Sequence, residues 1–145
     1  MTREPVAAIA LDLGRQRIGV AGCDRLGLVT VELTTIERRG LAADLAQLAA
    51  IVRDRQVELL VIGLPYDGDG SIGSQGRSVQ KLGRKIAKAL ALPIVWVDEQ
   101  FTSAEAEAQL RREGLEPSRD RGRVDRRAAA LILEQWLGDR ASISR

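Results

Sequence analysis

Hydrophobic residues along this chain recur first with the period of a β-strand and later with the period of an α-helix. Apolar runs bounded by turn residues predict five strands, over Ala7–Leu13, Ile18–Cys23, Leu28–Ile36, Leu59–Ile62 and Ile94–Val97. Short turns separate the first three strands, which favours an antiparallel meander. Longer segments precede the last two, which is typical of parallel strands reached by crossovers.

Apolar residues spaced three or four positions apart predict the helices. These helices cover Leu41–Arg55, Gln75–Leu90, Thr102–Gly114 and Asp125–Leu137. Thr102, with Glu105 three residues later, has the spacing of a capping box at the start of the third helix. The order βββαβαβα then predicts an α/β domain, in which a five-stranded mixed sheet is flanked by helices.

Length and composition restrict the class of protein. With 145 residues the chain is expected to form one domain over residues 1–145, with 138–145 as a flexible tail. It has no histidine, which excludes a Ser-His-Asp triad and an imidazole general base. Its single cysteine, Cys23, excludes an internal disulfide and ordinary zinc sites. No apolar run approaches the roughly 18 residues that a membrane span needs, and the start of the chain lacks a signal-peptide pattern, so a cytoplasmic location without a membrane partner is expected.

Basic residues are unevenly distributed, although the formal net charge is only +2. The segment from Arg77 to Lys88 contains five basic residues and no acid, and at helical spacing they share an arc of about 100°. The simpler interpretation is the solvated face of an amphipathic helix, and the alternative is a surface that binds nucleic-acid phosphates. The predicted nucleic-acid-binding residues are Arg77, Lys81, Arg84, Lys85, Lys88, Arg121 and Arg123.

Acidic residues occur at the ends of two predicted strands and at the start of the last predicted helix. Asp12 ends the first strand, and Gly14 after it would let a phosphate approach the backbone. Asp98 and Glu99 follow the last strand, so one is expected to point toward the first strand and the other away. Asp125 begins the last helix on its apolar side, which directs it toward the strand ends.

Each acid also has a purely structural interpretation. Asp12 suits a turn before glycine, Asp98 and Glu99 could be solvated, and Asp125 could be an N-cap. Asp69, in the loop after the fourth strand, suits a flexible turn. Carboxylates gathered at one sheet edge would repel one another unless a cation intervened, and the hard oxygen ligands favour one or two Mg²⁺ or Mn²⁺ ions.

Four ordered motifs make the chain resemble a known family. These motifs read ALDLGRQRIGVA, VIGLPYDGDG, VDEQFTSAEAE and GRVDRRAAALILEQWL, and they span about Ala7 to Leu137. They resemble the YqgF family, also called RuvX, which is described as Holliday-junction resolvases or pre-16S rRNA processing nucleases with a ribonuclease H-like fold. The resemblance implies a metal-dependent nuclease in which Asp12, Glu99 and Asp125 are both the catalytic acids and the metal ligands, and Asp69 matches the acid of the family's Gly-Leu-Pro loop. The predicted accessory residues are Gly14, Asp69 and Asp98.

The chain departs from the family pattern at several positions. Gln100 stands where the family usually has arginine, and Ile72 where an acid is common. Arg126 and Arg127 replace smaller residues. These differences bear on substrate handling, and either arginine could supply the charge that Gln100 lacks.

The sequence is compatible with three functions. The first is a nuclease acting on structured RNA or branched DNA, for which a symmetric homodimer would suit a four-way junction. The second is a non-catalytic ribosome-assembly factor that binds nucleic acid through its basic helix, and Gln100 is its best support. The third is a nucleotide-handling domain of the actin type, which needs two such domains where this chain has room for one.

Overall fold

The computed structural model describes residues 5–99 and 101–143, the last three by their backbone alone. The strands are β1 (Ala8–Leu13), β2 (Arg17–Cys23), β3 (Thr30–Glu37), β4 (Leu59–Leu64) and β5 (Ile94–Asp98). The helices are α1 (Leu41–Arg55), α2 (Ser74–Leu90), α3 (Thr102–Arg112) and α4 (Arg121–Ile143), with a 3₁₀ turn at Pro117–Arg119. Two helices follow β5, as the predicted helices Thr102–Gly114 and Asp125–Leu137 require, so the order of the regular elements is βββαβαβαα rather than βββαβαβα.

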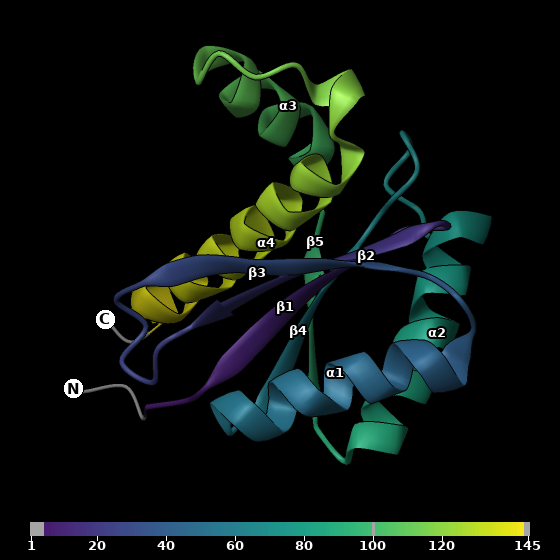
Figure 1. The fold of residues 1–145 in the computed structure, drawn as a ribbon, viewed down its shortest axis with the longest axis vertical. Helices are drawn as coiled ribbons and strands as arrows, with labels where there is room; N and C mark the ends of the chain where they lie inside the picture. The colour runs from purple at the N-terminus through teal and green to yellow at the C-terminus, as the bar shows by residue number, and fades with distance from the viewer. Residues whose placement is uncertain (1–4, 100, 144–145) are drawn as a thin grey trace.

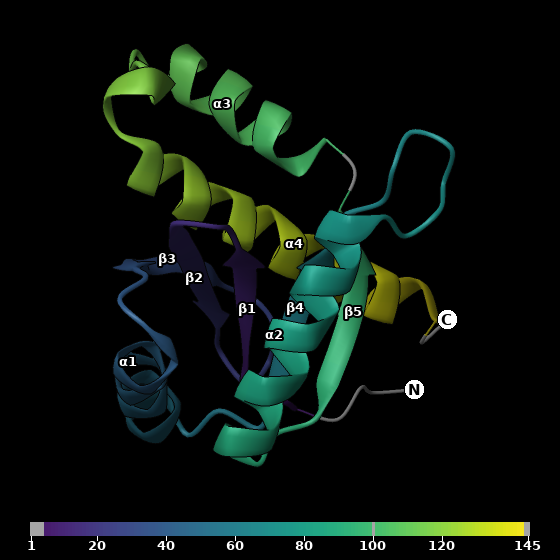
Figure 2. The ribbon, with the colours of Figure 1, turned by 90° about the vertical axis from the view of Figure 1, so that its right-hand side faces the viewer.

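The five strands form one mixed sheet with the order β3-β2-β1-β4-β5. β1, β2 and β3 pair antiparallel, whereas β4 and β5 run parallel to β1, which confirms the predicted meander and parallel pair. Figures 1 and 2 show α1 and α2 on one face of this sheet, α4 across the other, and α3 beyond the sheet beside the start of α4. No helix in the described part of the chain combines the length and the apolar character of a membrane span.

Side-chain size along β1 explains how closely each layer of helices can approach. Ile9 and Leu11 are fully buried toward α1 and α2, where large aliphatic side chains fill the core. Ala8 and Ala10 point to the opposite face, where they pack beneath α4. Because side chains alternate along a strand, the next residue on the α4 side is Asp12. β1 therefore directs the carboxylate of Asp12 toward α4, on the same side of the sheet as the small side chains of Ala8 and Ala10.

Gly19 brings the backbone of α4 against the sheet at the same level. It lies opposite Asp12 in the β1–β2 register. A Cβ atom built at Gly19 would collide with the backbone carbonyl of Asp125 and would lie 3.0 Å from the amide nitrogen of Arg126. A glycine inside a strand often marks such a close backbone approach. The absence of a side chain at Gly19 thus fixes where Asp125 sits.

The predicted ends of the last two helices need correction. α4 begins at Arg121, four residues before Asp125, because Asp120 accepts a hydrogen bond from the backbone N–H of Arg123 (3.0 Å). Asp125 is consequently not an N-cap. The segment 138–143, expected to be part of a flexible tail, continues α4 as helix.

The predicted capping box at the start of α3 is also wrong. Phe101 occupies the N-cap position in a left-handed conformation (φ 63°), and none of the described side chains caps the helix. Thr102 is the first helical residue, and the carboxylate of Glu105 instead accepts hydrogen bonds from Gln109 (3.2 Å) and Arg112 (3.2 Å). Because the chain turns sharply at Phe101, the threonine enters the helix one position too late to cap it.

Candidate active site

Three carboxylates that are far apart in the sequence line one pocket at the edge of the sheet. Asp12 comes from β1, Glu99 follows β5, and Asp125 lies in the second turn of α4. The pocket has a volume of about 270 Å³, and Gly14, Gln75 and residues 101–104 complete its wall. The structure therefore brings together all three residues that the sequence analysis selected as catalytic acids and metal ligands.

Asp12 and Glu99 form a close pair whose titration is strongly displaced. Burial, together with the nearby charge of Asp125, raises the pKa of Asp12 to about 7, although a hydrogen bond from Glu99 acts in the opposite direction. Burial, the charge of Asp12 and the same hydrogen bond raise the pKa of Glu99 to about 8. The hydrogen bond lowers one pKa and raises the other, so the shared proton resides on Glu99. Without a cation, the pocket holds this pair partly protonated at neutral pH.

Asp125 is held differently, by an ion pair with a residue of β2. The Nε of Arg17 donates to its Oδ2 at 2.6 Å, and both side chains are about one-fifth exposed. Arg17 precedes Gly19 by two residues and so points to the same side of the sheet. The sequence analysis missed Arg17, because nothing in the spacing of two residues 108 positions apart indicates that they meet.

The donor set suits a divalent cation, although the cluster is not fully assembled. Carboxylate oxygens are the ligands that Mg²⁺ and Mn²⁺ prefer, and a bound cation would offset both the burial and the repulsion that raise the pKa values of Asp12 and Glu99. Within the described residues, however, no three Asp, Glu, Cys or His side chains are grouped closely enough to hold a metal ion together. Asp12 and Glu99 are the pair that could bind one first, since Arg17 already occupies Asp125.

The raised pKa values predict that stability falls as pH rises when divalent cations are removed. The folded state then binds more protons than the unfolded state, in which both carboxyl groups titrate near pH 4, so the free energy of unfolding declines through the folded-state pKa values. The expected loss between pH 5 and 8 is about 6 kcal/mol, because the folded state keeps the proton of Asp12 for about two of those pH units and that of Glu99 for about two and a half, at about 1.4 kcal/mol per unit. Urea unfolding in EDTA would measure it.

A matched variant assigns this pH dependence to the pair. Glu99→Gln keeps the size of the side chain but removes the acid that retains the proton, so its unfolding free energy should depend much less on pH between 5 and 8. An equally steep dependence in Glu99→Gln would show that other groups are responsible.

The accessory residues divide between the pocket and the surface. Gly14 lines the pocket, and Glu99 points toward β1 while Asp98 is exposed on the other side, as strand alternation predicts. Asp69 does not join them. Its Oδ1 accepts hydrogen bonds from the backbone N–H (3.0 Å) and hydroxyl (2.6 Å) of Ser71 within an exposed loop, which supports the turn interpretation.

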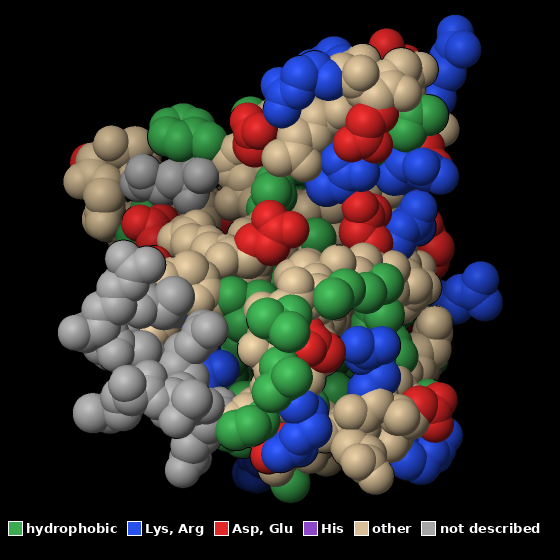
Figure 3. Space-filling view, turned by 90° about the vertical axis from the view of Figure 1, so that its left-hand side faces the viewer, with side chains coloured by type: hydrophobic (Ala, Val, Ile, Leu, Met, Phe, Trp, Pro, Cys, Tyr) green, Lys and Arg blue, Asp and Glu red, His purple; other side chains and the backbone are tan. Residues whose placement is uncertain are grey.

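The predicted basic residues also separate into two groups. The five on α2 are all exposed, and their row runs from the first turn of the helix to the last, but none of them lines the pocket. Arg121 and Arg123 instead pair with Glu107 (2.8 Å) and Asp120 (3.6 Å). Figure 3 shows basic and acidic side chains interspersed over α3, so this part of the surface is not uniformly basic.

Two of the residues that depart from the family pattern, Arg126 and Arg127, link α4 to neighbouring elements. Arg127 pairs with Glu32 of β3 (2.7 Å) and Glu113 after α3 (2.6 Å), and these partners raise its pKa. Arg126 donates to the hydroxyl of Thr35 (3.2 Å). Neither is among the described residues of the pocket, so neither supplies a charge there.

The two other departures from the family pattern are Ile72 and Gln100. Ile72 packs against the aliphatic core beside α2 rather than at the carboxylates. Gln100 lies outside the described residues.

Comparison with solved structures defines the class of protein. RuvC from T. thermophilus in complex with a Holliday junction substrate matches with a TM-score of 0.53 at 12% sequence identity, covering 93% of this chain and 96% of that chain. A second Thermus thermophilus RuvC structure matches with a TM-score of 0.52 at 13% identity, over 91% and 96% of the two chains. At these identities the likeness concerns the fold alone, which is the ribonuclease H-like fold predicted from the sequence.

Sequence comparison then identifies the family. A family model described as "RuvX: Holliday junction resolvase" matches residues 6–139, and this chain belongs to that family. A protein of Synechococcus elongatus named "Putative pre-16S rRNA nuclease" is 59% identical over 133 residues, which cover 92% of this chain and 89% of the relative. A protein of the same name from Trichormus variabilis is 54% identical over 132 residues, 91% and 87% of the two chains.

Proposed function

We propose that this protein is a divalent-metal-dependent nuclease that hydrolyses phosphodiester bonds in structured nucleic acid. The convergence of Asp12, Glu99 and Asp125 on one pocket is the observation that carries the proposal. The names of the relatives favour precursor 16S rRNA as the substrate, and the description of the family model makes a Holliday junction the alternative. A symmetric dimer, which a four-way junction would suit, stays a prediction.

The residues of the pocket divide the work of hydrolysis among them. Asp12 and Glu99 would bind the cation, which when bound supplies a Lewis acid that activates a water and stabilises the leaving oxygen. Arg17 fixes the carboxylate of Asp125 at the pocket wall, ready to orient a water or a ligand. Gly14 has no side chain to keep a phosphate from the backbone. The water loses one proton as its oxygen bonds to phosphorus, the bond to the leaving oxygen breaks, and the leaving oxygen takes up one proton, so that one water is consumed overall.

The proposal is tested by a cleavage panel with Mg²⁺, Mn²⁺ and EDTA. Precursor 16S rRNA fragments, synthetic four-way DNA junctions and linear duplexes of matched length serve as substrates. We expect cleavage of at least one structured substrate with either metal, and none in EDTA, because two adjacent carboxylates cannot both ionise at low cost without a cation.

The contrary result would be salt-sensitive binding without metal-dependent cleavage of any substrate in the panel. It would favour the assembly factor that binds nucleic acid without cutting it. Cleavage that is undiminished in EDTA would also contradict the proposal, since it would remove the role of the cation.

A further inference from the structure

A second pocket adjoins the carboxylate pocket on the side of α2. It has a volume of about 140 Å³, several times the roughly 30 Å³ that one water occupies in the liquid. Leu13, Gly14, Gln75 and Val79 line both pockets, so the two share a wall. We refer to it as the arginine pocket, because Arg15 and Arg38 are its only charged lining residues among those described.

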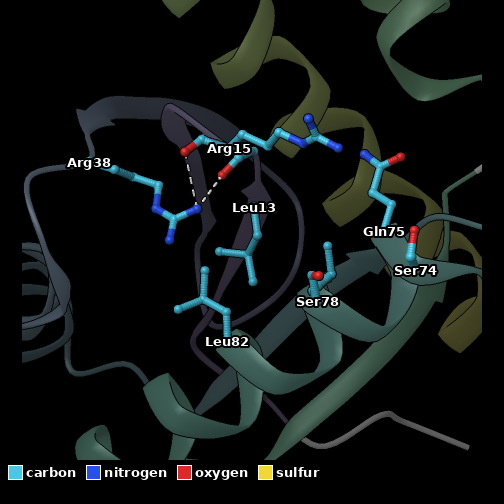
Figure 4. Close-up of a pocket in the computed structure, with 9 residues that line it drawn as sticks. Leu13, Arg15, Arg38, Ser74, Gln75, Ser78 and Leu82 are labelled. Atoms are coloured by element: carbon cyan, nitrogen blue, oxygen red, sulfur yellow. Dashed lines mark hydrogen bonds between the residues drawn. The ribbon is translucent and has the colours of Figure 1, made fainter.

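Arg15 and Arg38 line this pocket, and no described carboxylate forms an ion pair with either of them. Figure 4 shows Arg38 beneath the turn between β1 and β2, where its Nη1 donates to the carbonyl oxygens of Gly14 (2.8 Å) and Arg15 (3.3 Å). A guanidinium has five N–H donors, so these bonds leave others for a ligand. Within the described residues no ion pair joins Arg15 or Arg38 to a carboxylate, whereas Arg17 nearby is paired.

The wall that faces the arginines comes from the start of α2. Ser74, Gln75 and Ser78 place hydroxyl and amide groups beside the pocket, and Figure 4 shows the Arg15 side chain extended toward Gln75. The helix has no side-chain cap and no acid in its first turn, so its free N–H groups add to the donors there. Two cations, two hydroxyls and no acid form a site for an anion with several oxygens.

We propose that the arginine pocket binds a backbone phosphate of the nucleic-acid strand, next to the phosphate that is cleaved at the carboxylates. This inference rests on the proposed function, since it places the pocket along the strand whose cleaved bond lies in the neighbouring one. Phosphates follow one another at about 3.4 Å of helix axis per strand, so a strand held at one pocket must present a phosphate close to the other. The site positions the strand without reading its bases.

The test measures binding separately from cleavage. A short fluorescein-labelled single-stranded RNA is titrated in EDTA, between about 50 and 200 mM salt, and followed by anisotropy. Arg15→Gln/Arg38→Gln should weaken binding about ten-fold at the lower salt and reduce the salt slope by about one. Arg53→Gln/Arg111→Gln removes two arginines outside both pockets and should change binding less than two-fold.

A second variant tests the same pocket without removing the hydrogen bonds that Arg38 donates to the turn after β1. Ser78→Asp places an acid in the first turns of α2, where it suits the helix but repels a phosphate. It should weaken binding of the same RNA about as much as the double arginine variant. Ser78→Asn has nearly the same shape without the charge and should bind within two-fold of the wild-type protein.

Chemically modified RNA locates the contact. One neutral methylphosphonate is moved along the strand, and at a single position it should weaken binding to the wild-type protein but not to Arg15→Gln/Arg38→Gln. Wild-type affinity in both Arg15→Gln/Arg38→Gln and Ser78→Asp would overturn the inference. So would inorganic phosphate that saturates the pocket at micromolar concentration while RNA binding is unaffected by the variants, which would indicate a site for a small free anion.

The outcomes separate this inference from the proposed nuclease. Mn²⁺ binding to the carboxylates, followed by calorimetry, should be unchanged in the double arginine variant because neither Arg15 nor Arg38 lines the carboxylate pocket. A protein that cleaves with Mg²⁺ but binds RNA equally well with and without these arginines would retain the proposed function and lose the subsite.

Discussion

Asp12→Asn is expected to reduce metal-dependent cleavage about a thousand-fold while leaving the protein folded. The substitution keeps the shape of the side chain but removes the carboxylate that faces both Glu99 and Asp125. A cation would lose a charged ligand at the reacting centre, and losing one such electrostatic interaction typically lowers rates by about 10²–10³ or more. Single-turnover cleavage of the substrate found in the panel measures the effect.

The same variant should be at least as stable as the wild-type protein in EDTA. Burial and the charge of Asp125 both disfavour the ionised form of Asp12, and asparagine carries no charge that burial or repulsion can penalise. We therefore expect a higher thermal midpoint at pH 8, and a smaller change at pH 5, where the wild-type carboxyl group is already protonated.

Asp98→Asn provides the matched control for Asp12→Asn. It makes the same chemical change beside Glu99, but on an exposed side chain that points away from the pocket, so cleavage should stay within two-fold of the wild-type rate. Cleavage by Asp12→Asn within ten-fold of the wild-type rate would rule out a central role for that carboxylate.

Much of the fold follows from the alternation of side chains along the strands. The pattern in β1 predicts which side each residue faces, and it places Asp12 beyond Ala8 and Ala10 on the α4 side. The same alternation turns Glu99 inward and Asp98 outward. Because parallel strands end at a common edge, β1 and β5 bring their acids together without any further information.

The contacts between layers could not be predicted in the same way. The sequence places Gly19 within a predicted strand and Arg17 just before it, but it does not indicate which helix crosses above them. The pairing of Arg17 with Asp125 depends on the closeness of α4, and that closeness depends on Gly19. A glycine inside an apolar strand was the available signal for a close backbone approach.

The ends of the helices were the other feature that the sequence did not predict correctly. Several residues near each end could serve as caps, and the choice depends on where the chain leaves the preceding turn. Asp120 caps α4 in preference to Asp125, because α4 starts four residues earlier to pack against α3. At α3 the left-handed turn at Phe101 decides the start, and no sequence pattern indicates it.

Gly19→Ala is expected to destabilise the fold by about 3 kcal/mol and to lower cleavage more than ten-fold. The added methyl group would collide with the backbone carbonyl of Asp125, and backbone in a buried helix cannot move aside as a flexible side chain can. α4 must shift outward, which moves Asp125 away from Asp12. The same shift lengthens the ion pair between Asp125 and Arg17. Urea unfolding and cleavage at saturating Mg²⁺ measure the two effects.

Gly138→Ala is the matched control, since it makes the same chemical change in α4, the helix whose backbone Gly19 contacts. No described atom lies within 4 Å of a Cβ built at Gly138, so alanine should raise helix stability by up to about 1 kcal/mol without affecting cleavage. If Gly19→Ala proved as stable and as active as Gly138→Ala, then α4 would not be held at its observed distance from β2. The position of Asp125 at the pocket would then need another explanation.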